Sequence, residues 1–387
     1  MKHIPAFEKQ ILTTVSNLQH SSPMHLLAAV GDIDGDGRPD CVVSAGNGQM
    51  VWLQNAGDRQ WPARLIDDVE QMGCGGTLSD LTGNGLADVI NGSNRHGDEL
   101  YWWENSGSWD ERWRRRLIAK TGIFQIHDVL VADITGDGTL SLVFTNRMGA
   151  AGTSIFRVPV PINPRVSPWP GIETIYVGAA EHNEHSTQSG GPPQPEEGLA
   201  VGDIDGDGRL ELIGGTRWFK YVRGRWQAHK FTRGYVATRC AVGDINGDGH
   251  DEIVLAEGSA VADGRLAWFE PGRDPTKPWT EHLLDKGLQE ARSLAVADML
   301  GNGNGDIVVG ELGNRNEEQE LIGRPPELRV YQNDGSGNFT SHVIDSGMGT
   351  DRSIVAITTD SSTCDIICKP LYGPDHRNVI RWKNTTE

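Results

Sequence analysis

A nine-residue acidic and glycine-rich pattern recurs along this chain and constrains its fold more than any other feature. Its strongest copy reads D-I-D-G-D-G-R-P-D, and two others, D-I-D-G-D-G-R-L-E and D-I-N-G-D-G-H-D-E, keep the same spacing. The three strong copies cover residues 32–40, 203–211 and 244–252, and weaker copies cover residues 80–88, 133–141 and 298–306. Repetition of this kind indicates an architecture in which one structural unit is built several times.

Each strong copy places oxygen-bearing side chains at positions 1, 3, 5 and 9 of a tight loop. Ca²⁺ takes six to eight oxygen ligands, so the pattern predicts structural Ca²⁺ sites in these loops. Glycines at positions 4 and 6 let the chain fold back without a Cβ clash. The predicted ligands are Asp32, Asp34, Asp36, Asp40, Asp203, Asp205, Asp207, Glu211, Asp244, Asn246, Asp248 and Glu252, with Asp80, Asp88, Asp133 and Asp137 in two weaker copies.

An EF-hand is the alternative that the D-x-D-G-D-G spacing raises. An EF-hand loop requires a bidentate Glu at its twelfth position. That position holds Val43, Gly214 and Leu255 in the three strong copies. We therefore reject a helix–loop–helix interpretation.

Short apolar runs surround the loops. One run precedes the loop, as in L-L-A-A-V, and a second follows it, as in C-V-V. An aromatic run such as V-W-L-Q-N comes third, and a run such as W-P-A-R-L-I-D ends the unit. These runs, bounded by Gly, Asn and Asp, predict four antiparallel strands per unit. With a worn seventh copy near Thr358, the chain is predicted to be all-β, a single seven-bladed β-propeller over residues 1–387.

The two ends of the chain complement each other. The last unit stops after its third run, I-R-W-K-N, whereas A-F-E-K-Q-I-L-T near the start resembles the fourth run W-T-E-H-L-L-D of another unit. We expect the N-terminal strand to complete the last blade and to close the ring. Closure removes the long exposed edge that an open sheet would present.

The repeat resembles the FG-GAP/VCBS repeat of integrin α-subunits and of many microbial proteins, and the likeness extends over nearly the whole chain. The pattern W-W-E-N together with T-R-W-F is also similar to the propeller of aldos-2-ulose dehydratase, a metal-dependent sugar dehydratase, and to propeller polysaccharide lyases that act on uronate-containing glycans. The resemblance implies Ca²⁺-loop blades and an activity on carbohydrate. This chain lacks the cupin-like part of the dehydratase.

The formal net charge of −18 argues against nucleic acid or an anionic membrane as a partner, and much of the acidity lies in the metal loops. No apolar stretch is long enough to span a bilayer. The start M-K-H-I-P-A-F-E-K-Q lacks the apolar core of a signal peptide, and five cysteines are an odd number. We expect reduced cysteines and a cytoplasmic protein, with secretion after removal of a leader as the alternative. The sequence leaves the oligomeric state open.

In such a ring, the start of each first strand lies on the face opposite the metal loops, around one mouth of the central channel. The residues five to seven places before the loops should meet there: His25, Cys74, His127 with Asp128, Glu196 with Glu197, Arg239, Arg292 and Arg352. Loops between second and third strands enter the same face and bring His96, Arg147, Arg217, Trp218, Lys369 and Tyr372. A long insertion at about residues 159–197 adds His182 and His185, which could hold a second divalent metal ion on this face.

Arginines beside a histidine suit β-elimination from a sugar. Guanidinium groups neutralise a uronate carboxylate or polarise a ketone, and this acidifies the adjacent C–H bond. We predict His127 as the proton acceptor and Tyr372 or His96 as the acid for the leaving oxygen. The residues expected to bind substrate are Arg239, Arg292, Arg352, Glu197, Arg217, Trp218, Arg147, His25 and Lys369. The predicted protein is thus a carbon–oxygen lyase, either a polysaccharide lyase or a sugar dehydratase, with carbohydrate as its partner.

Three alternatives stay open at this point. The arginines could instead pair around the channel with the acids Glu197, Glu257 and Glu311. A sugar-binding lectin would repeat one pocket between blades, whereas the residues at the channel mouth differ from blade to blade. A protein-interaction scaffold would need a broad exposed aromatic patch, which the loops of this face do not obviously offer.

Overall fold

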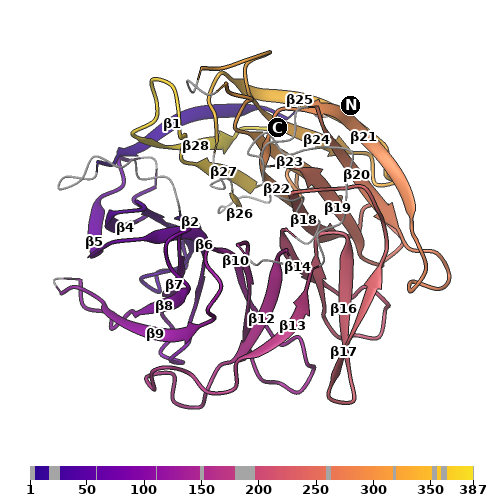
Figure 1. The fold of residues 1–387 in the computed structure, drawn as a ribbon. Coiled ribbons are helices and arrows are strands. Elements are labelled where there is room, and N and C mark those ends of the chain that lie inside the picture. The colour runs from indigo at the N-terminus through magenta and orange to yellow at the C-terminus, as the bar shows by residue number, and fades with distance from the viewer. Residues whose placement is uncertain are drawn as a thin grey trace.

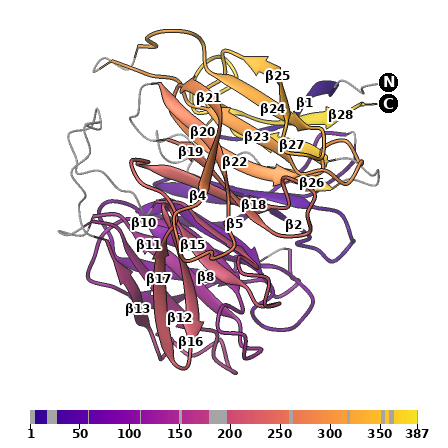
Figure 2. The same ribbon diagram turned by 90° about the vertical axis from the view of Figure 1, so that its right-hand side faces the viewer.

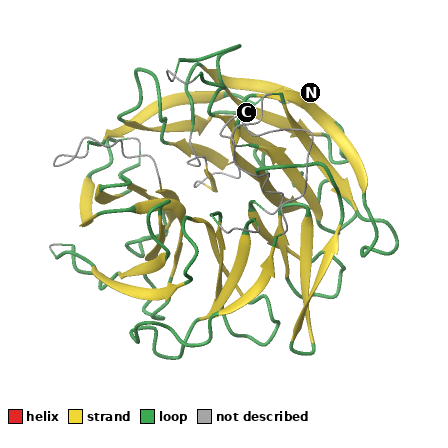
Figure 3. Cartoon of the chain, viewed as in Figure 1, coloured by secondary structure: helices red, strands yellow, loops and turns green. Residues whose placement is uncertain are grey.

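The computed structural model describes residues 5–16, 27–57, 59–109, 111–148, 152–178, 197–258, 263–316, 320–350, 355–358 and 364–386. In these ranges the chain consists of strands and loops (Figure 3). The strands form seven antiparallel sheets of four strands each. Within the same ranges, no helix is long and apolar enough to cross a membrane.

The first four blades follow one another along the chain, and each takes four consecutive strands. Blades one and two comprise β2 (Leu27–Gly31), β3 (Asp40–Ser44), β4 (Gly48–Leu53), β5 (Ala63–Val69), β6 (Met72–Ser79), β7 (Asp88–Ser93), β8 (Glu99–Glu104) and β9 (Arg114–Lys120). Blades three and four comprise β10 (Ile126–Ala132), β11 (Ser141–Asn146), β12 (Ser154–Pro159), β13 (Glu173–Val177), β14 (Leu199–Gly202), β15 (Glu211–Gly214), β16 (Arg217–Val222) and β17 (Arg225–Lys230).

Of the last three blades, five and six again take four consecutive strands, whereas blade seven takes one strand from the N-terminus. Blades five and six comprise β18 (Thr238–Gly243), β19 (Glu252–Glu257), β20 (Gly264–Glu270), β21 (Thr280–Leu288), β22 (Ala291–Ala297), β23 (Asp306–Glu311), β24 (Glu327–Asn333) and β25 (Phe339–Ser346). Blade seven comprises β26 (Val355–Thr358), β27 (Cys364–Cys368), β28 (Asn378–Asn384) and the N-terminal strand β1 (Phe7–Thr14).

The seven sheets are arranged like propeller blades around a central channel (Figure 1). In the first six blades the spatial order of the strands is their order in the chain, so the first strand of each blade lines the channel and the fourth lies at the rim. This arrangement confirms the predicted all-β, seven-bladed propeller. The acidic loops connect the first and second strands, as the sequence pattern requires.

The seam between the two ends of the chain is formed by β1 and β28. They pair antiparallel, with Lys9 opposite Trp382 and Ile11 opposite Ile380, and the two ends lie together at one edge of the ring (Figure 2). Leu12 of β1 is buried against the hydrophobic core that blade seven shares with blade one. The prediction that the N-terminal strand completes the last blade is therefore confirmed.

The hydrophobic core lies between adjacent blades. Because successive side chains of a strand point to opposite faces, Trp103 of β8 packs with Trp52 of blade one, whereas its neighbour Trp102 packs with Phe144 of blade three. Close approach of neighbouring first strands keeps the channel narrow. A Cβ on Gly75 of β6 would lie only 2.8 Å from the carbonyl carbon of His127 in β10. The blades thus hold the starts of their first strands close together.

Candidate functional site

One cavity in the described part of the channel gathers residues from five blades. Its volume is about 200 Å³, and the first strands of blades two to six line it. The side chains with chemistry to offer are Cys74, His127, Asp128, Arg239, Cys240 and Arg292. All of them except Cys240, which stands four places before its loop, stand five or six places before their acidic loops, so the repeat register brings them to one place.

His127 lies between two carboxylates. Its Nδ1 is 2.9 Å from Asp128 Oδ2, and its Nε2 is 3.4 Å from Glu197 Oε1. Glu197 is fully buried, and the same Oε1 is 2.7 Å from Arg147 Nε. Arginine, carboxylate, imidazole and a second carboxylate therefore form a continuous polar chain that ends at the cavity.

This environment changes the role that His127 can have. The residue is only 1% exposed, and each ring nitrogen already faces a carboxylate oxygen. Asp128 is more open, with 18% of its side chain exposed. Thr145 Oγ1 donates to Asp128 Oδ2 over 3.1 Å, and the Gly198 amide donates to the same oxygen over 3.3 Å. Asp128 is thus the more accessible member of the pair, and the buried imidazole of His127 contacts its carboxylate.

The two arginines of the cavity come from neighbouring first strands, and each is anchored. Arg239 donates Nε to the carbonyl of Arg292 over 3.2 Å and Nη1 to the carbonyl of Thr238 over 2.9 Å. Arg292 Nη2 lies 3.2 Å from Glu290 Oε2. The backbone carbonyls hold the guanidinium of Arg239 in place at the cavity. Guanidinium groups on the wall of a cavity favour an anionic or strongly polar ligand.

Two of the acids that could have paired with these arginines have other partners. Glu257 Oε2 is 2.9 Å from Arg265 Nε, and Glu311 Oε1 is 2.5 Å from Arg324 Nη2. Glu197 pairs with Arg147, as described above. The alternative of a ring of salt bridges through Glu257 and Glu311 around the channel is therefore not what the described residues form.

Burial disfavours the thiolate form of Cys240 in the cavity. All five cysteines are free thiols, as predicted. Burial raises the pKa of the Cys240 thiol to about 12, and its Sγ lies 3.5 Å from the carbonyl oxygen of Gly198. A thiol, unlike a thiolate, is a poor nucleophile and a poor metal ligand at neutral pH. Arginine and carboxylate groups thus dominate the chemistry of the cavity.

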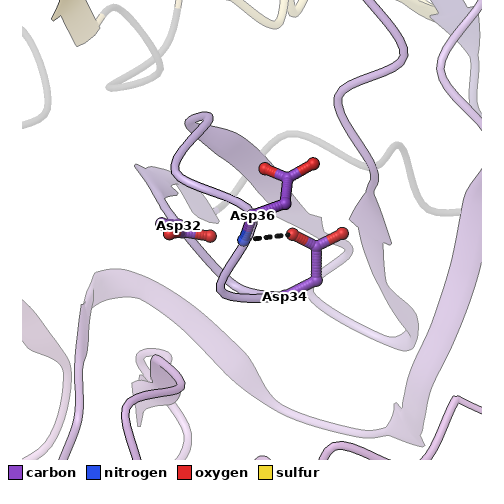
Figure 4. A group of neighbouring side chains, drawn as sticks. All are labelled: Asp32, Asp34 and Asp36. Atoms are coloured by element: carbon purple, nitrogen blue, oxygen red, sulfur yellow. Dashed lines mark hydrogen bonds between the residues drawn. The ribbon is translucent and has the colours of Figure 1, made fainter.

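The metal loops lie at the opposite ends of the first strands. In blade one, carboxylate oxygens of Asp32, Asp34 and Asp36 come within 4.8 Å of one another, and the Asp36 amide donates to Asp34 Oδ1 (Figure 4). Gly35 and Gly37 have positive φ values of 77° and 82°, and their amides donate to the two oxygens of Asp32. Three close carboxylates on such a loop fit a hard cation, so Ca²⁺ remains our prediction for blade one.

Comparison with protein families agrees with this loop geometry. Residues 80–144 and 244–309 match the model of the FG-GAP-like repeat. Each matched segment runs from one acidic loop to the second strand of the next blade. The chain carries FG-GAP-like repeats.

Relatives outside the FG-GAP repeat model are distant. Cartilage acidic protein 1 of Xenopus tropicalis is 29% identical over 192 residues, which are 48% of this chain and 28% of that protein. Among solved structures, BBS1N in complex with ARL6DN has a TM-score of 0.53 at 12% identity, with 96% of this chain and 97% of that chain covered. Rhamnogalacturonan lyase YesW has a TM-score of 0.50 at 13% identity, with 98% and 76% covered. At these identities the solved structures share the fold alone.

The carboxylate of the ninth residue of the FG-GAP loop accepts backbone amides. Asp88 accepts the Leu81 amide through Oδ2 at 3.0 Å and the Asn105 amide through Oδ1 at 2.7 Å. Asp40 accepts two backbone amides in the same way and lies outside the close carboxylate group of blade one. In both loops one carboxylate oxygen of the ninth residue therefore accepts an amide of the loop itself, and the other accepts the amide of the asparagine at the end of the third strand. That Asp40 and Asp88 bind Ca²⁺ stays a prediction.

Sequence reasoning missed the asparagine that ends several third strands. Asn105 Nδ2 donates to the Ile33 carbonyl of blade one at 2.8 Å, and Asn333 Nδ2 donates to the Ile245 carbonyl of blade five at 2.7 Å. Asn384 Nδ2 makes the same contact with a carbonyl of blade six. These contacts link one FG-GAP loop to the next blade. The signal was present in the runs W-W-E-N, V-Y-Q-N and R-W-K-N.

The FG-GAP loop of blade four contains a cation of its own. Lys220 Nζ contacts Asp205 Oδ2, lies 2.6 Å from Asp207 Oδ2 and lies 3.5 Å from Glu211 Oε1. Carboxylate oxygens of Asp203, Asp205 and Glu211 also come within 4.8 Å of one another. The residues predicted to hold Ca²⁺ here therefore surround an ammonium group.

Trp218 does not offer a sugar platform. It lies on β16 rather than in a loop, is 1% exposed, stacks on His229 at a centroid distance of 4.4 Å and donates Nε1 to the Pro275 carbonyl. Arg217 lies over the ring of Tyr176 at 5.1 Å. Trp218, which the sequence predicted to bind substrate, thus belongs instead to the core between blades four and five.

Three other predicted site residues also lie outside the cavity. Lys369 is buried and donates to the carbonyls of Pro370 and His376. His96 is exposed in the loop between β7 and β8. The ring of Tyr372 lies under the guanidinium of Arg315 at 3.7 Å. None of them lines the cavity, so the proposed acid for the leaving oxygen is not found among them.

Some predicted residues lie outside the described ranges. They are His25, His182, His185, Glu196 and Arg352. Most of the worn seventh loop after Thr358 lies outside them as well. The second metal site on the channel face therefore remains a prediction.

Proposed function

We propose that this protein is a carbon–oxygen lyase that acts on one uronate or keto-sugar residue in the channel cavity. The observation that carries the proposal is the asymmetry of the cavity. Blades five and six contribute Arg239 and Arg292, whereas blade three contributes Asp128 backed by His127. A cationic side and a carboxylate side suit a reaction that stabilises negative charge at one atom and removes a proton from its neighbour.

The elimination proceeds between these two sides. The guanidinium groups bind the uronate carboxylate or the ketone oxygen and stabilise the charge that develops there. Asp128 takes the proton from the adjacent carbon, the electron pair of that C–H bond forms a C=C bond, and the C–O bond at the next carbon breaks. The proton then passes from Asp128 to the departing oxygen, so atoms and charges balance without a further reactant.

The size of the cavity favours a small substrate. Its volume of about 200 Å³ is below the range of about 300–1,000 Å³ that is usual for drug-sized ligands. One sugar-acid residue therefore enters, either as a free keto-sugar or as the terminal residue of a chain. Ca²⁺ in the FG-GAP loops has a structural role in this scheme, because those loops lie at the other ends of the first strands.

The proposal is tested by incubating the purified Ca²⁺-loaded protein with oligogalacturonates, rhamnogalacturonan and keto-sugars. The expected product carries a C=C bond conjugated to a carboxylate or ketone, so ultraviolet absorbance rises with time. Rhamnogalacturonan is included because a rhamnogalacturonan lyase shares this fold. Mass spectrometry of the product distinguishes elimination from hydrolysis, since only hydrolysis adds water.

Variants of the cavity separate catalysis from binding. Asp128→Asn should lower turnover by roughly 10²- to 10⁴-fold, as is usual for a general acid–base group. Arg292→Lys should raise KM, because an ammonium cannot reproduce the planar fork of a guanidinium. Arg95→Ala, an exposed arginine of the same face, is the matched control and should leave both constants unchanged.

A lectin is the outcome that would replace this proposal. Sugar binding at several equivalent sites per chain, with no product from any substrate, would show a binding protein without catalysis. Binding at a single site that Arg292→Lys weakens, again without product, would keep the cavity as a ligand site and remove the lyase assignment.

A further inference from the structure

We propose that the FG-GAP loop of blade four takes Lys220 in place of Ca²⁺, so that this loop is closed by an internal cation. The inference concerns the loop that matches the metal-binding pattern as well as any other in the chain. It is independent of the lyase proposal, because the loop lies at the opposite end of the first strands from the cavity.

The geometry places the ammonium among the carboxylates. Nζ of Lys220 contacts oxygens of Asp205, Asp207 and Glu211. The side chain reaches them because β15 and β16 pair with Leu212 opposite Phe219, which sets Lys220 directly across from the ninth loop residue. Only 19% of the lysine side chain is exposed. A metal ion that shared these oxygens would have to displace the ammonium.

Blade one provides the comparison. Its loop has the same acidic pattern, with carboxylates at positions 1, 3, 5 and 9, but the residue across from the ninth position is Gln54. Gln54 Nε2 donates to Asp34 Oδ2 at 2.6 Å, and an amide carries no charge. Arg38 pairs with Asp36 alone and extends outward, with 44% of its side chain exposed. Blade one thus has an uncharged amide where blade four has an ammonium. It also has Asp40 in place of Glu211 at position 9, and Arg64 Nη2 donates to Gln54 Oε1 at 3.1 Å.

The physical consequence follows from charge. The three close carboxylates of blade one should attract a divalent cation, whereas in blade four the covalently tethered ammonium of Lys220 already lies among the carboxylates. Binding Ca²⁺ there requires the loss of the lysine's ion pairs and brings two like charges close together, which costs free energy. Blade four should thus keep its loop conformation at Ca²⁺ concentrations that empty the loop of blade one.

Counting bound ions tests the proposal. We would measure Ca²⁺ per chain by elemental analysis after equilibrium dialysis, for the wild type, Lys220→Gln and Gln54→Lys. Lys220→Gln should bind one more ion than the wild type, because the freed carboxylates now resemble those of blade one. Gln54→Lys should bind one ion fewer. Anomalous density should place the gained ion between Asp205 and Asp207.

Lys383→Gln is the matched control. Lys383 lies opposite Asp365, at the equivalent third-strand position of blade seven, beside the sequence T-T-D-S-S-T-C-D, which lacks the acidic pattern. The Lys383→Gln substitution removes the same positive charge as Lys220→Gln and should leave the number of bound Ca²⁺ ions unchanged. Thermal unfolding gives a second readout. In chelator, Lys220→Gln should have a lower melting temperature than the wild type, and added Ca²⁺ should restore it.

Two results would overturn the proposal. One is wild-type protein with an ion ligated by Asp205 and Asp207 while Lys220 points away. The other is an unchanged ion count in both Lys220→Gln and Gln54→Lys. Should Lys220→Gln fail to fold even with Ca²⁺, Gln54→Lys alone decides, because loss of one ion supports a lysine-for-Ca²⁺ exchange and no loss refutes it.

Discussion

Lys369 shows how burial of one residue couples the fold to pH. Burial lowers its pKa from 10.5 to about 8, so the folded state releases this proton before the unfolded state does. Below pH 8 both states hold the proton and the cost of burying the charge is present in full. Between pH 8 and 10.5 the unfolded state binds more protons, so this residue's contribution to the free energy of unfolding rises with pH, by at most about 1.4 kcal/mol per unit.

Lys369→Met should therefore remove this residue's contribution to the pH dependence of the free energy of unfolding between pH 8 and 10.5. Urea unfolding of the wild type and of the variant across this range is the measurement, and the difference between their free energies should shift in favour of the wild type as pH rises. Lys383→Gln serves as a control, since Lys383 is more accessible. Parallel pH curves for the wild type and Lys369→Met would contradict the argument.

Trp218 gives a prediction that separates core packing from sugar binding. Trp218→Ala should lower stability by about 3–5 kcal/mol, as is usual when a buried tryptophan is truncated, while any ligand affinity of the folded variant stays at the wild-type value. Trp218→Phe should recover most of the loss. Calorimetry and ligand titration test this together, and wild-type stability with lost binding would restore the platform hypothesis.

The residues at the cavity were only partly predictable from sequence. The repeat register correctly placed His127, Arg239 and Arg292 near one another, because each stands at a fixed distance before its loop. The same register placed Glu197 at the channel mouth, but it did not specify that this carboxylate contacts His127 Nε2 and Arg147 Nε. Trp218 was misplaced because a shift of one or two residues decides whether a side chain lies in a loop or on a buried strand face.

At the scale of elements, the third-strand asparagine is a device that joins blades. Asn105 satisfies the carbonyl of Ile33 in one blade and that of Ala87 in its own. Asn105→Ala should leave buried carbonyls unsatisfied and cost about 1–3 kcal/mol. Asn338 is an exposed asparagine directly before β25, and its Nδ2 donates only to the exposed Asp334. Asn338→Ala should change stability by less than about 0.5 kcal/mol. Equal melting temperatures for the two variants would contradict a joining role.

Elements were predictable wherever periodicity defined them. The loops, the strands on either side and the fourth strand supplied by the N-terminus all follow from the repeat. The cation that each loop holds does not follow from the repeat. Lys220 lies on the third strand of its blade, and the pairing of the second and third strands is what brings it to the loop. Reading the residue opposite the ninth loop position would have identified it.

At the scale of the whole molecule, the seam makes the ring depend on both ends of the chain. Deleting residues 1–16 removes β1 and uncovers the outer edge of β28 together with the apolar surface that Leu12 and Val15 cover. Burial of two such side chains contributes roughly 3–6 kcal/mol. We expect a lower melting temperature and concentration-dependent association through the open edge.

Light scattering and thermal unfolding measure these two effects. Deleting only residues 1–4 leaves β1 in place and is the matched control. A peptide of residues 5–16 added to the shortened protein should restore the melting temperature. A monomeric shortened protein with wild-type stability would show that the seam is dispensable.

The same seam imposes an order on synthesis. Strand β1 leaves the ribosome before all the other strands of the ring, and its partner β28 leaves after them. At about 5–20 residues per second, β1 waits roughly 20 to 75 seconds with its apolar side chains uncovered. During that time the nascent chain presents an unpaired strand to chaperones and to other nascent chains. Fast translation or early chaperone binding should therefore raise the yield of this protein more than any gain in the stability of the finished ring.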